Sequence, residues 1–285
     1  MATRIFLPET LDDLWALLDG EPDSVLYAGG TDLLVKKRAG LISPRSLICL
    51  ERIEELRKIE DDSGTIYLGA CVTHSQILGH PVLNERVPIL TKAIQTLGSP
   101  LIRNMGTLGG NICTASPAAD TLPPLYTLGA EVRIRSKKRS RKRALHEFVS
   151  GPGKTSLRPK EIVFGIGVKK DLDYNVHHYE KVGQRKALAI AVASLAALIK
   201  VSKANIIERA RLAWGSLGPT IVTSKEIEEK LIGKPLHKNT LIGLFPMVRE
   251  VVSPIDDIRG SAEYRRTLAC HLLLRLLQYK GTVEI

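Results

Sequence analysis

The sequence lacks the cysteine patterns that hold metals, iron–sulfur clusters or a disulfide framework. None of its four cysteines belongs to a C-x-x-C pair; they are Cys49, Cys71, Cys113 and Cys270. Adjacent histidines, His177 and His178, would point to opposite sides of an extended segment, so we expect them to be exposed rather than metal-bound. We therefore predict no metal site in this chain, and reduced, mostly buried thiols.

Long apolar runs are also absent. The longest, residues 187–199, falls short of the roughly 18 residues that a membrane span needs. Residues 1–13 contain acidic side chains and no apolar stretch, which is unlike a signal peptide. We therefore expect a cytoplasmic protein with no membrane span.

Acidic residues are too few to balance the basic ones, and the formal net charge is +11. Much of the excess lies in residues 133–143, RIRSKKRSRKR. Such a run can be a solvated hairpin, a surface that docks an acidic partner, or a nucleic-acid site. A platform for single-stranded nucleic acid needs aromatic side chains among the basic ones, and this run has none. We favour the hairpin, leave docking open and expect no nucleic-acid binding.

The 285 residues, 44% apolar and 25% charged, suit one large globular domain or two modest ones. In residues 1–168, periodicity and turn residues predict helices at residues 11–18, with Thr10 as the N-cap, and at residues 74–78 and 89–97. A short helical or turn segment is predicted at residues 51–57. Strands are predicted at residues 25–27, 46–50, 65–69, 131–135 and 161–168. Residues 98–124 are rich in Gly, Ser, Thr, Asn and Pro, and we predict a long functional loop there.

A polar segment, residues 169–175, separates a second region. Its apolar run, residues 188–201, could form a strand or a helix, because periodicity alone does not distinguish them. Residues 208–216 could be the antiparallel partner of such a strand. Helices are predicted at residues 224–232, 240–252 and 262–279.

A first glycine segment, residues 26–33 (LYAGGTDL), follows a predicted strand. Its two glycines permit positive φ and let a ligand approach the backbone closely. Successive N–H groups in such a turn can form an anion-binding nest, and Thr31 adds a hydroxyl. Asp32 is predicted to cap the helix that follows. An ordinary strand–turn–helix connection would have the same pattern.

A second glycine segment, residues 104–120 (NMGTLGGNICTASPAAD), again joins two glycines to small hydroxyl and amide side chains. It ends in a carboxylate, Asp120. These groups suit a pyrophosphate and a polyhydroxyl chain, so two such segments suggest a dinucleotide held by two half-sites. Asp120 could instead cap a helix that starts near Thr121.

Together the two segments resemble the paired glycine loops of the flavoprotein subunits of molybdenum hydroxylases, such as xanthine dehydrogenase and carbon monoxide dehydrogenase. The matching forms are A-G-G-T-D-L, and G-T-I/L-G-G-N-I followed by A-S/D-P-x-x-D. The resemblance covers essentially the whole chain. It extends to Gly69-Ala70 with Thr73-His74, to Tyr179-Glu180-Lys181 with residues 187–190, and to residues 258–266.

This resemblance implies an α+β fold. Residues 1–174 would form a two-part FAD-binding domain of the vanillyl-alcohol-oxidase (PCMH) type, with lobes at about 1–58 and 59–174. Residues 175–285 would form the smaller α+β C-terminal domain of these subunits.

The resemblance also implies a non-covalent FAD site. The pyrophosphate would lie against two groups of residues: Leu26, Tyr27, Ala28, Gly29, Gly30, Thr31, Asp32 and Leu33, and Thr107, Leu108, Gly109, Gly110 and Asn111. Asp120 would meet ribityl or ribose hydroxyls, and Val163 would lie near the adenine. Lys181 and Ile190 would lie near the flavin ring, and Ser116 would also contact the cofactor.

The chain departs from the xanthine dehydrogenases at two places. Leu97 stands where they tend to place an aromatic residue over the flavin. Residues 184–187 (QRKA) stand where they carry acidic side chains. The residue that stacks on the flavin and the use of NAD therefore stay open.

The function implied is that of an electron-passing subunit in a hetero-oligomer. A molybdopterin subunit would oxidise a substrate, and an iron–sulfur subunit with two 2Fe-2S clusters would reduce the FAD bound here. Electrons would then pass to NAD, a quinone or another acceptor, and the flavin itself would carry the chemistry. We assign no catalytic acid or base. A self-contained FAD oxidoreductase of the same fold, and a basic binding module, are the alternatives.

Overall fold

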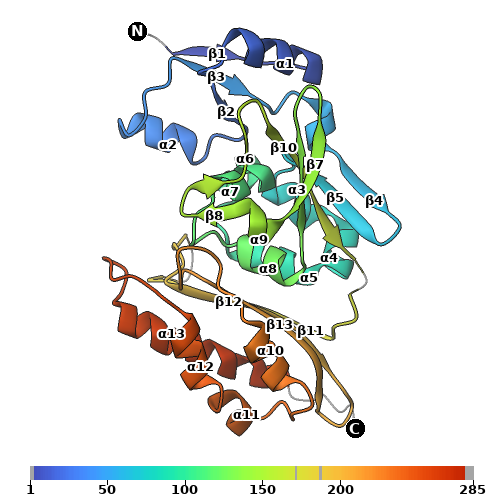
Figure 1. Ribbon diagram of the computed structural model, residues 1–285, viewed down its shortest axis with the longest axis vertical. Coiled ribbons are helices and arrows are strands. Elements are labelled where there is room, and N and C mark those ends of the chain that lie inside the picture. Colours follow the sequence, from blue (N-terminus) through green and yellow to red (C-terminus); the bar gives the residue numbers. More distant parts are fainter. Residues whose placement is uncertain (1–2, 171, 186–187, 280–285) are drawn as a thin grey trace. The chain divides into compact units, whose positions relative to one another are not determined.

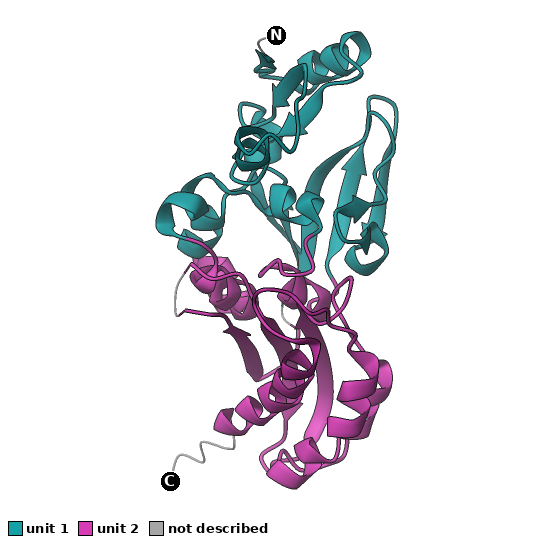
Figure 2. Cartoon of the chain, turned by 90° about the vertical axis from the view of Figure 1, so that its left-hand side faces the viewer, with its two compact units in different colours: residues 1–80, 99–115, 130–170 teal, residues 81–98, 116–129, 171–285 magenta. Residues whose placement is uncertain are grey.

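The computed structural model describes residues 3–170, 172–185 and 188–279. Its helices and strands are labelled in Figure 1, and it contains two compact units, each built from three separate segments of the chain (Figure 2). Unit 1 comprises residues 1–80, 99–115 and 130–170, and unit 2 comprises residues 81–98, 116–129 and 171–285. The domain boundary after residue 174 stays a prediction.

Unit 1 contains a parallel three-stranded sheet in the order β1-β3-β2. Its strands are β1 (Arg4–Phe6), β2 (Val25–Tyr27) and β3 (Ser46–Cys49). Helix α1 (Leu11–Gly20) covers it with a buried stripe that includes Leu14 and Trp15. Thr10 and Asp13 form a capping box at the start of α1, so the predicted N-cap is confirmed. Helix α2 (Leu33–Arg38) follows β2, and a 3-10 turn, η1 (Glu54–Arg57), follows β3.

The second sheet of unit 1 is antiparallel, with five strands in the order β4-β5-β10-β6-β7. The strands are β4 (Ile59–Asp62), β5 (Thr65–Gly69), β6 (Glu131–Arg135), β7 (Ser140–Ala144) and β10 (Ile162–Lys169). Helices α3 (His74–Gly79), α6 (Pro100–Met105) and α7 (Leu108–Thr114) precede β6, and α7 packs on β10 and β5. Helix α9 (Leu145–Phe148) and the small ribbon of β8 (Val149–Gly151) and β9 (Lys154–Thr155) precede β10.

The basic run at residues 133–143 forms the hairpin of β6 and β7, as predicted. Several of its charges already have partners within unit 1. The Arg141 guanidinium donates to both carboxylate oxygens of Glu161, at 2.9 and 2.6 Å. The Arg133 guanidinium lies over the Tyr67 ring, 3.2 Å from its centroid. Arg141 is therefore paired with a carboxylate and Arg133 is packed on a ring, so neither side chain is free in solvent.

The predicted loop at residues 98–124 is wrong, because this stretch contains α6, α7 and the start of α8 (Leu122–Thr127). The hydroxyls of Ser99 and Thr107 cap α6 and α7 by accepting from the N–H groups of Ile102 and Gly110. Each helix is only six or seven residues long. Such short helices show no clear 3.6-residue periodicity, and their polar and glycine residues resemble those of a loop.

Unit 2 contains an antiparallel sheet in the order β11-β12-β13, formed by β11 (Val176–Val182), β12 (Ala193–Val201) and β13 (Ile207–Gly215). One face packs on the apolar core formed with α10 (Lys225–Leu231), α11 (Lys238–Ile242), α12 (Phe245–Val251), α13 (Ala262–Leu274) and η2 (Arg275–Tyr279). Helices α5 (Pro88–Thr96) and α8 also contact the sheet, and α4 (Pro81–Arg86) precedes α5. Among the described residues, no helix has the length and apolarity to cross a bilayer.

The apolar run at residues 188–201, which could have been a strand or a helix, contains strand β12. Residues 193–199 are all buried, since both faces of the strand are covered. A strand buried on both faces has a continuous apolar sequence without alternation. The antiparallel partner predicted for it is confirmed as β13. The helix predicted at residues 240–252 is divided into α11 and α12.

The prediction that both histidines of β11 are exposed is wrong for His178, which is 2% exposed. Its ring meets the edge of Tyr279, with centroids 5.7 Å apart, and its Nδ1 lies 3.1 Å from Nε2 of Gln278. His177, on the opposite face, is half-buried. No local sequence pattern indicates that η2 covers this part of β11.

We expect His178 to make the fold sensitive to acid. Burial lowers the pKa of His178 from 6.5 to about 4, so the unfolded chain takes up this proton at a higher pH than the folded chain. The contribution of His178 to stability is therefore complete above pH 6.5 and is lost as the pH falls towards 4. The loss amounts to at most roughly 3 kcal/mol.

Urea unfolding between about pH 7.5 and 4.5 tests this expectation. His178→Phe keeps an aromatic ring against Tyr279 and should reduce the pH dependence of the free energy of unfolding, of which the buried His74 supplies a further part. His146→Phe changes an exposed histidine and should leave that dependence unchanged. Equal slopes for the parent and His178→Phe would contradict the expectation.

Candidate functional site

The first glycine segment leaves the carboxyl end of β2 and leads into α2. Gly30 has φ +68°, which lies in the left-handed region that glycine adopts without strain. Gly29 is needed for a different reason. A Cβ on Gly29 would lie 1.6 Å from the carbonyl oxygen of Met105, so only glycine permits this close approach of two backbone segments.

Three successive N–H groups of this segment are free. Within the described residues, the backbone N–H groups of Gly29, Gly30 and Thr31 donate no hydrogen bond to the protein. Backbone N–H groups that are shielded from water are normally paired, and this segment is half-buried. A row of such donors around a positive-φ residue forms a nest that suits an anion.

The predicted capping role of Asp32 is wrong. Asp32 precedes α2, but its backbone is in the right-handed helical region and its side chain makes no cap hydrogen bond. Its carboxylate instead accepts from Lys36 Nζ at 2.7 Å and from Thr114 Oγ1 at 3.2 Å. Asp32 therefore ties the start of α2 to the end of α7.

The second glycine segment has its backbone donors occupied. The N–H groups of Leu108, Gly109 and Asn111 donate to Val72, Ala70 and Thr107 carbonyls, and the N–H of Gly110 donates to the Thr107 hydroxyl. A Cβ on Gly109 would lie 2.6 Å from the Ala70 oxygen, so Gly109 lets α7 pack closely after β5. Gly110 is exposed and helical, and a Cβ there would meet only Thr107 Oγ1, at 2.9 Å. What this segment can offer a ligand is mainly the open surface at Gly110.

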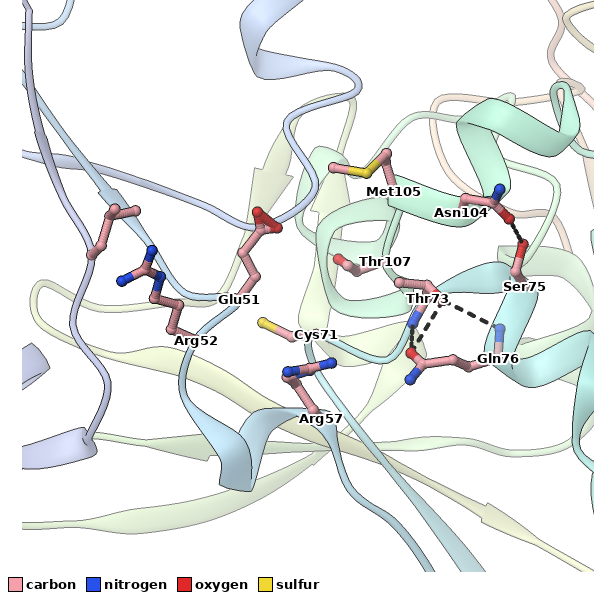
Figure 3. A pocket seen from close by; sticks show the side chains of 11 residues that line it. Glu51, Arg52, Arg57, Cys71, Thr73, Ser75, Gln76, Asn104, Met105 and Thr107 are labelled. Atoms are coloured by element: carbon pink, nitrogen blue, oxygen red, sulfur yellow. Dashed lines mark hydrogen bonds between the residues drawn. The ribbon is translucent and has the colours of Figure 1, made fainter.

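Unit 1 also contains a cavity of about 610 Å³. Glu51 and Arg52 lie on one side of it, and Thr73, Met105 and Thr107 lie on the other (Figure 3). The remaining lining residues are Leu7, Arg57, Cys71, Ser75, Gln76 and Asn104. The cavity therefore shares Thr107 with the second glycine segment, and its charged lining residues are Arg52, Arg57 and Glu51.

In unit 2, Asp120 is at the centre of a buried polar cluster. The Lys181 Nζ donates to Asp120 Oδ2 at 2.7 Å, and the Tyr179 hydroxyl donates to Oδ1 at 3.0 Å. Lys181 also donates to the carbonyl of Thr96 at 2.8 Å. Asp120 makes no cap hydrogen bond, because the N-cap of α8 is Thr121. The capping role considered for Asp120 is therefore wrong, and the side chain belongs to an ion pair.

Burial dominates the electrostatics of this cluster. It raises the pKa of the Asp120 carboxyl, against the opposing effect of Lys181 and Tyr179. It also raises the pKa of the Tyr179 hydroxyl well above its ordinary value. The phenol therefore stays protonated at neutral pH and acts as a hydrogen-bond donor.

The remaining predicted site residues, outside the Asp120 cluster, are distributed over units 1 and 2. Val163 is buried on β10, beside a bulge that ends at Gly165. Ser116 accepts from the N–H of Ala118 at 3.2 Å, Leu97 is buried and Ile190 is 61% exposed. Residues 184–187 stand where the xanthine dehydrogenases carry acidic side chains, and residues 186 and 187 lie outside the described part of the chain. Within that part, no group of three or more His, Cys, Asp or Glu side chains is placed to hold a metal.

Sequence reasoning did not assign a role to Tyr179 or to Gly215. A Cβ on Gly215 would lie 2.9 Å from Cγ of Pro123 and 2.4 Å from Oγ of Ser194, so this glycine lets the loop before α8 approach β13. The signal for Tyr179 was its spacing of two from Lys181 on a strand, which puts both side chains on one face.

Two family models cover almost the whole chain. Residues 1–168 match the FAD binding domain in molybdopterin dehydrogenase, and residues 178–279 match the CO dehydrogenase flavoprotein C-terminal domain. The chain is thus an FAD-binding oxidoreductase subunit with an α+β fold. It belongs to the family of FAD-binding medium subunits of the xanthine dehydrogenase and carbon monoxide dehydrogenase type, as the sequence resemblance implied.

Named relatives agree with this family. The chain is 32% identical over 268 residues to the nicotinate dehydrogenase FAD-subunit of Eubacterium barkeri, covering 92% of this chain and 90% of that one. It is 32% identical to the glyceraldehyde dehydrogenase medium chain of Sulfolobus acidocaldarius, covering 94% of each. The quinoline 2-oxidoreductase structure from Pseudomonas putida 86 superposes with a TM-score of 0.92 at 26% identity, covering 98% of this chain and 96% of that one.

Replacing Gly30 with alanine should remove bound FAD. The new Cβ would lie 2.7 Å from Cδ1 of Leu34 at a position with φ +68°, so the turn and its row of N–H donors would have to shift. We expect FAD affinity to fall about tenfold or more, which corresponds to about 1.4 kcal/mol or more. The measurement is the ratio of flavin to protein after desalting, followed by titration with FAD.

Gly40→Ala is the matched control. Gly40 has φ +72°, and a Cβ there would meet nothing within 4 Å. Both variants carry the backbone strain of about 1–2 kcal/mol, but only Gly30→Ala adds a contact with Leu34 and lies in the row of free donors. Equal flavin content in the two variants would show that the first glycine segment is a structural turn only.

Proposed function

We propose that this chain is the electron-transfer subunit of a molybdenum hydroxylase, receiving electrons from a partner's 2Fe-2S clusters on its FAD and passing them to NAD or another acceptor. The observation that carries the proposal is the row of free N–H donors at Gly29, Gly30 and Thr31. An FAD pyrophosphate would satisfy these donors with charge-assisted hydrogen bonds.

Two further features of unit 1 support the proposal. The open face at Gly110 and the cavity beside Thr107 give room for part of a dinucleotide, and Arg52 and Arg57 would favour its negative charge. The roles of Leu26, Tyr27, Ala28, Asp32, Leu33, Leu108, Gly109, Asn111, Ser116, Val163, Lys181 and Ile190 stay proposals.

Asp120 would bind sugar hydroxyls of the cofactor. Each carboxylate oxygen has about two lone pairs, and Tyr179 and Lys181 each occupy one oxygen. Asp120 therefore keeps acceptor capacity on both oxygens. Its loop and β11 hold it in place before a ligand arrives, which reduces the entropy lost on binding.

The partners are proposed from the named relatives, which are an FAD-subunit and a medium chain of dehydrogenases. We propose an iron–sulfur subunit and a molybdopterin subunit, in a cytoplasmic hetero-oligomer. When bound, the flavin can accept and release electrons singly or in pairs. The chain's own residues would bind and orient it, and the substrate would be chosen in the molybdopterin subunit.

The purified chain should bind FAD but oxidise no substrate. With FAD alone it should be yellow and reducible by dithionite, yet show no turnover of aldehydes, purines or other aromatic heterocycles. Turnover should appear only with co-purified chains that carry molybdenum and iron, detected by metal analysis. Multiple turnovers by the pure chain would favour a self-contained oxidoreductase, and failure to bind FAD would favour a basic binding module.

Asp120→Asn should weaken FAD binding roughly tenfold, because hydrogen bonds to a charged acceptor are worth about 1.5–3 kcal/mol and a neutral amide retains only part of this. The variant should also lose stability, since it leaves Lys181 without its counter-charge. FAD affinity is therefore measured well below the unfolding transition, by quenching of flavin fluorescence.

Asp257→Asn provides the control for lost stability. Asp257 accepts from Arg265 and Arg259, both at 2.6 Å, so this variant also breaks a partly buried ion pair of unit 2. It should leave FAD affinity unchanged. If both variants lose stability and neither loses FAD affinity, Asp120 has a structural role only.

A further inference from the structure

Strand β11 presents two donors to one carboxylate. Tyr179 and Lys181 are two residues apart, so their side chains lie on the same face of the strand. Opposite them on β12 are Ala196 and Ser194, which are small and leave space for the loop that carries Asp120. Both oxygens of Asp120 are engaged, one by each donor.

The backbone hydrogen bonds that anchor the loop do not involve the Asp120 side chain. It is anchored at Pro117, whose carbonyl accepts from the N–H of Ser216 at 2.8 Å, and at Ser116, which accepts from Ala119. Neither bond involves the carboxylate of Asp120. The direction of that side chain therefore depends on the two donors of β11, Tyr179 and Lys181.

The two donors hold the carboxylate differently. Lys181 has a long side chain, and its ammonium group is shared between Asp120 and the carbonyl of Thr96. One point charge attracts a carboxylate but does not fix its plane. Tyr179 has a rigid ring in a buried setting, and its hydroxyl reaches the other oxygen. Donors at both oxygens fix the plane of the carboxylate.

We infer that Tyr179 is a positioning residue for FAD binding, because it orients the Asp120 carboxylate so that the remaining lone pairs face the sugar hydroxyls of the cofactor. This inference rests on the proposed role of Asp120. Tyr179 donates to the carboxylate and would act on the cofactor through it.

The test is Tyr179→Phe in the full-length chain, titrated with FAD. The variant keeps the ring and removes one hydrogen bond, so FAD affinity should fall roughly 3- to 10-fold with little change in the folded structure. Tyr126→Phe is the matched control. Tyr126 lies on α8 in the same unit, and among the described residues its hydroxyl makes no hydrogen bond. Its loss should leave FAD affinity unchanged.

A second readout separates positioning from packing. The groups that face Asp120 are Lys181 and Tyr179. A donor to the charged carboxylate favours its ionised form, so losing the hydroxyl should make Asp120 take up a proton more readily. As the pH falls from about 7 towards 5, Tyr179→Phe should therefore lose FAD affinity at a higher pH than the parent. A residue that only packs would not move this profile.

The outcomes distinguish this inference from the proposed function. If Asp120→Asn weakens FAD binding and Tyr179→Phe matches the parent in affinity and pH profile, the positioning role is wrong and the role of Asp120 stands. If Asp120→Asn binds FAD like the parent, the proposed role of Asp120 is wrong and the positioning role falls with it.

Discussion

The close approach of Gly29 to the carbonyl of Met105 is the constraint on which the site in unit 1 depends. With a Cβ only 1.6 Å from that oxygen, any other residue would push the first glycine segment away from the end of α6. The approach brings the turn after β2 against the segment that leads into α7. It also explains why Asp32 reaches Thr114 instead of capping its own helix.

The two glycine segments look alike in sequence and differ in their backbone chemistry. In the first, the N–H groups of Gly29, Gly30 and Thr31 are left for a ligand. In the second, the N–H groups are used to cap and pack α7. Leaving a shielded donor unpaired costs free energy, about 1–3 kcal/mol. The first segment is therefore the less stable arrangement by itself, and an anion that pairs its donors would stabilise the fold.

In unit 2, the cluster around Asp120 also places polar groups where they are shielded from water. Burying a carboxylate and an ammonium is costly, and the cost is offset only when the geometry is good and further donors are present. Tyr179 and the carbonyl of Thr96 supply those further partners. A carboxylate held in this way is ready to accept from a sugar hydroxyl without first reorienting.

The sequence by itself determined the elements whose signals are local. The N-cap Thr10, strand β2 and the paired glycines could all be predicted, because the residues that form them are neighbours in the chain. The family could be predicted from the spacing of motifs. The short helices α6 and α7 were missed, since their caps and glycines also suit a loop.

Only the tertiary structure decided which partner each polar side chain has. Asp32 was predicted to cap α2, yet its carboxylate meets Thr114, 82 residues away. Asp120 meets Tyr179 and Lys181, which lie 59 and 61 residues further along the chain. His178 is covered by Gln278, 100 residues away. A short polar side chain can bond to any donor within about 3 Å, and that donor is set by packing of distant segments, not by the residues beside it in the sequence.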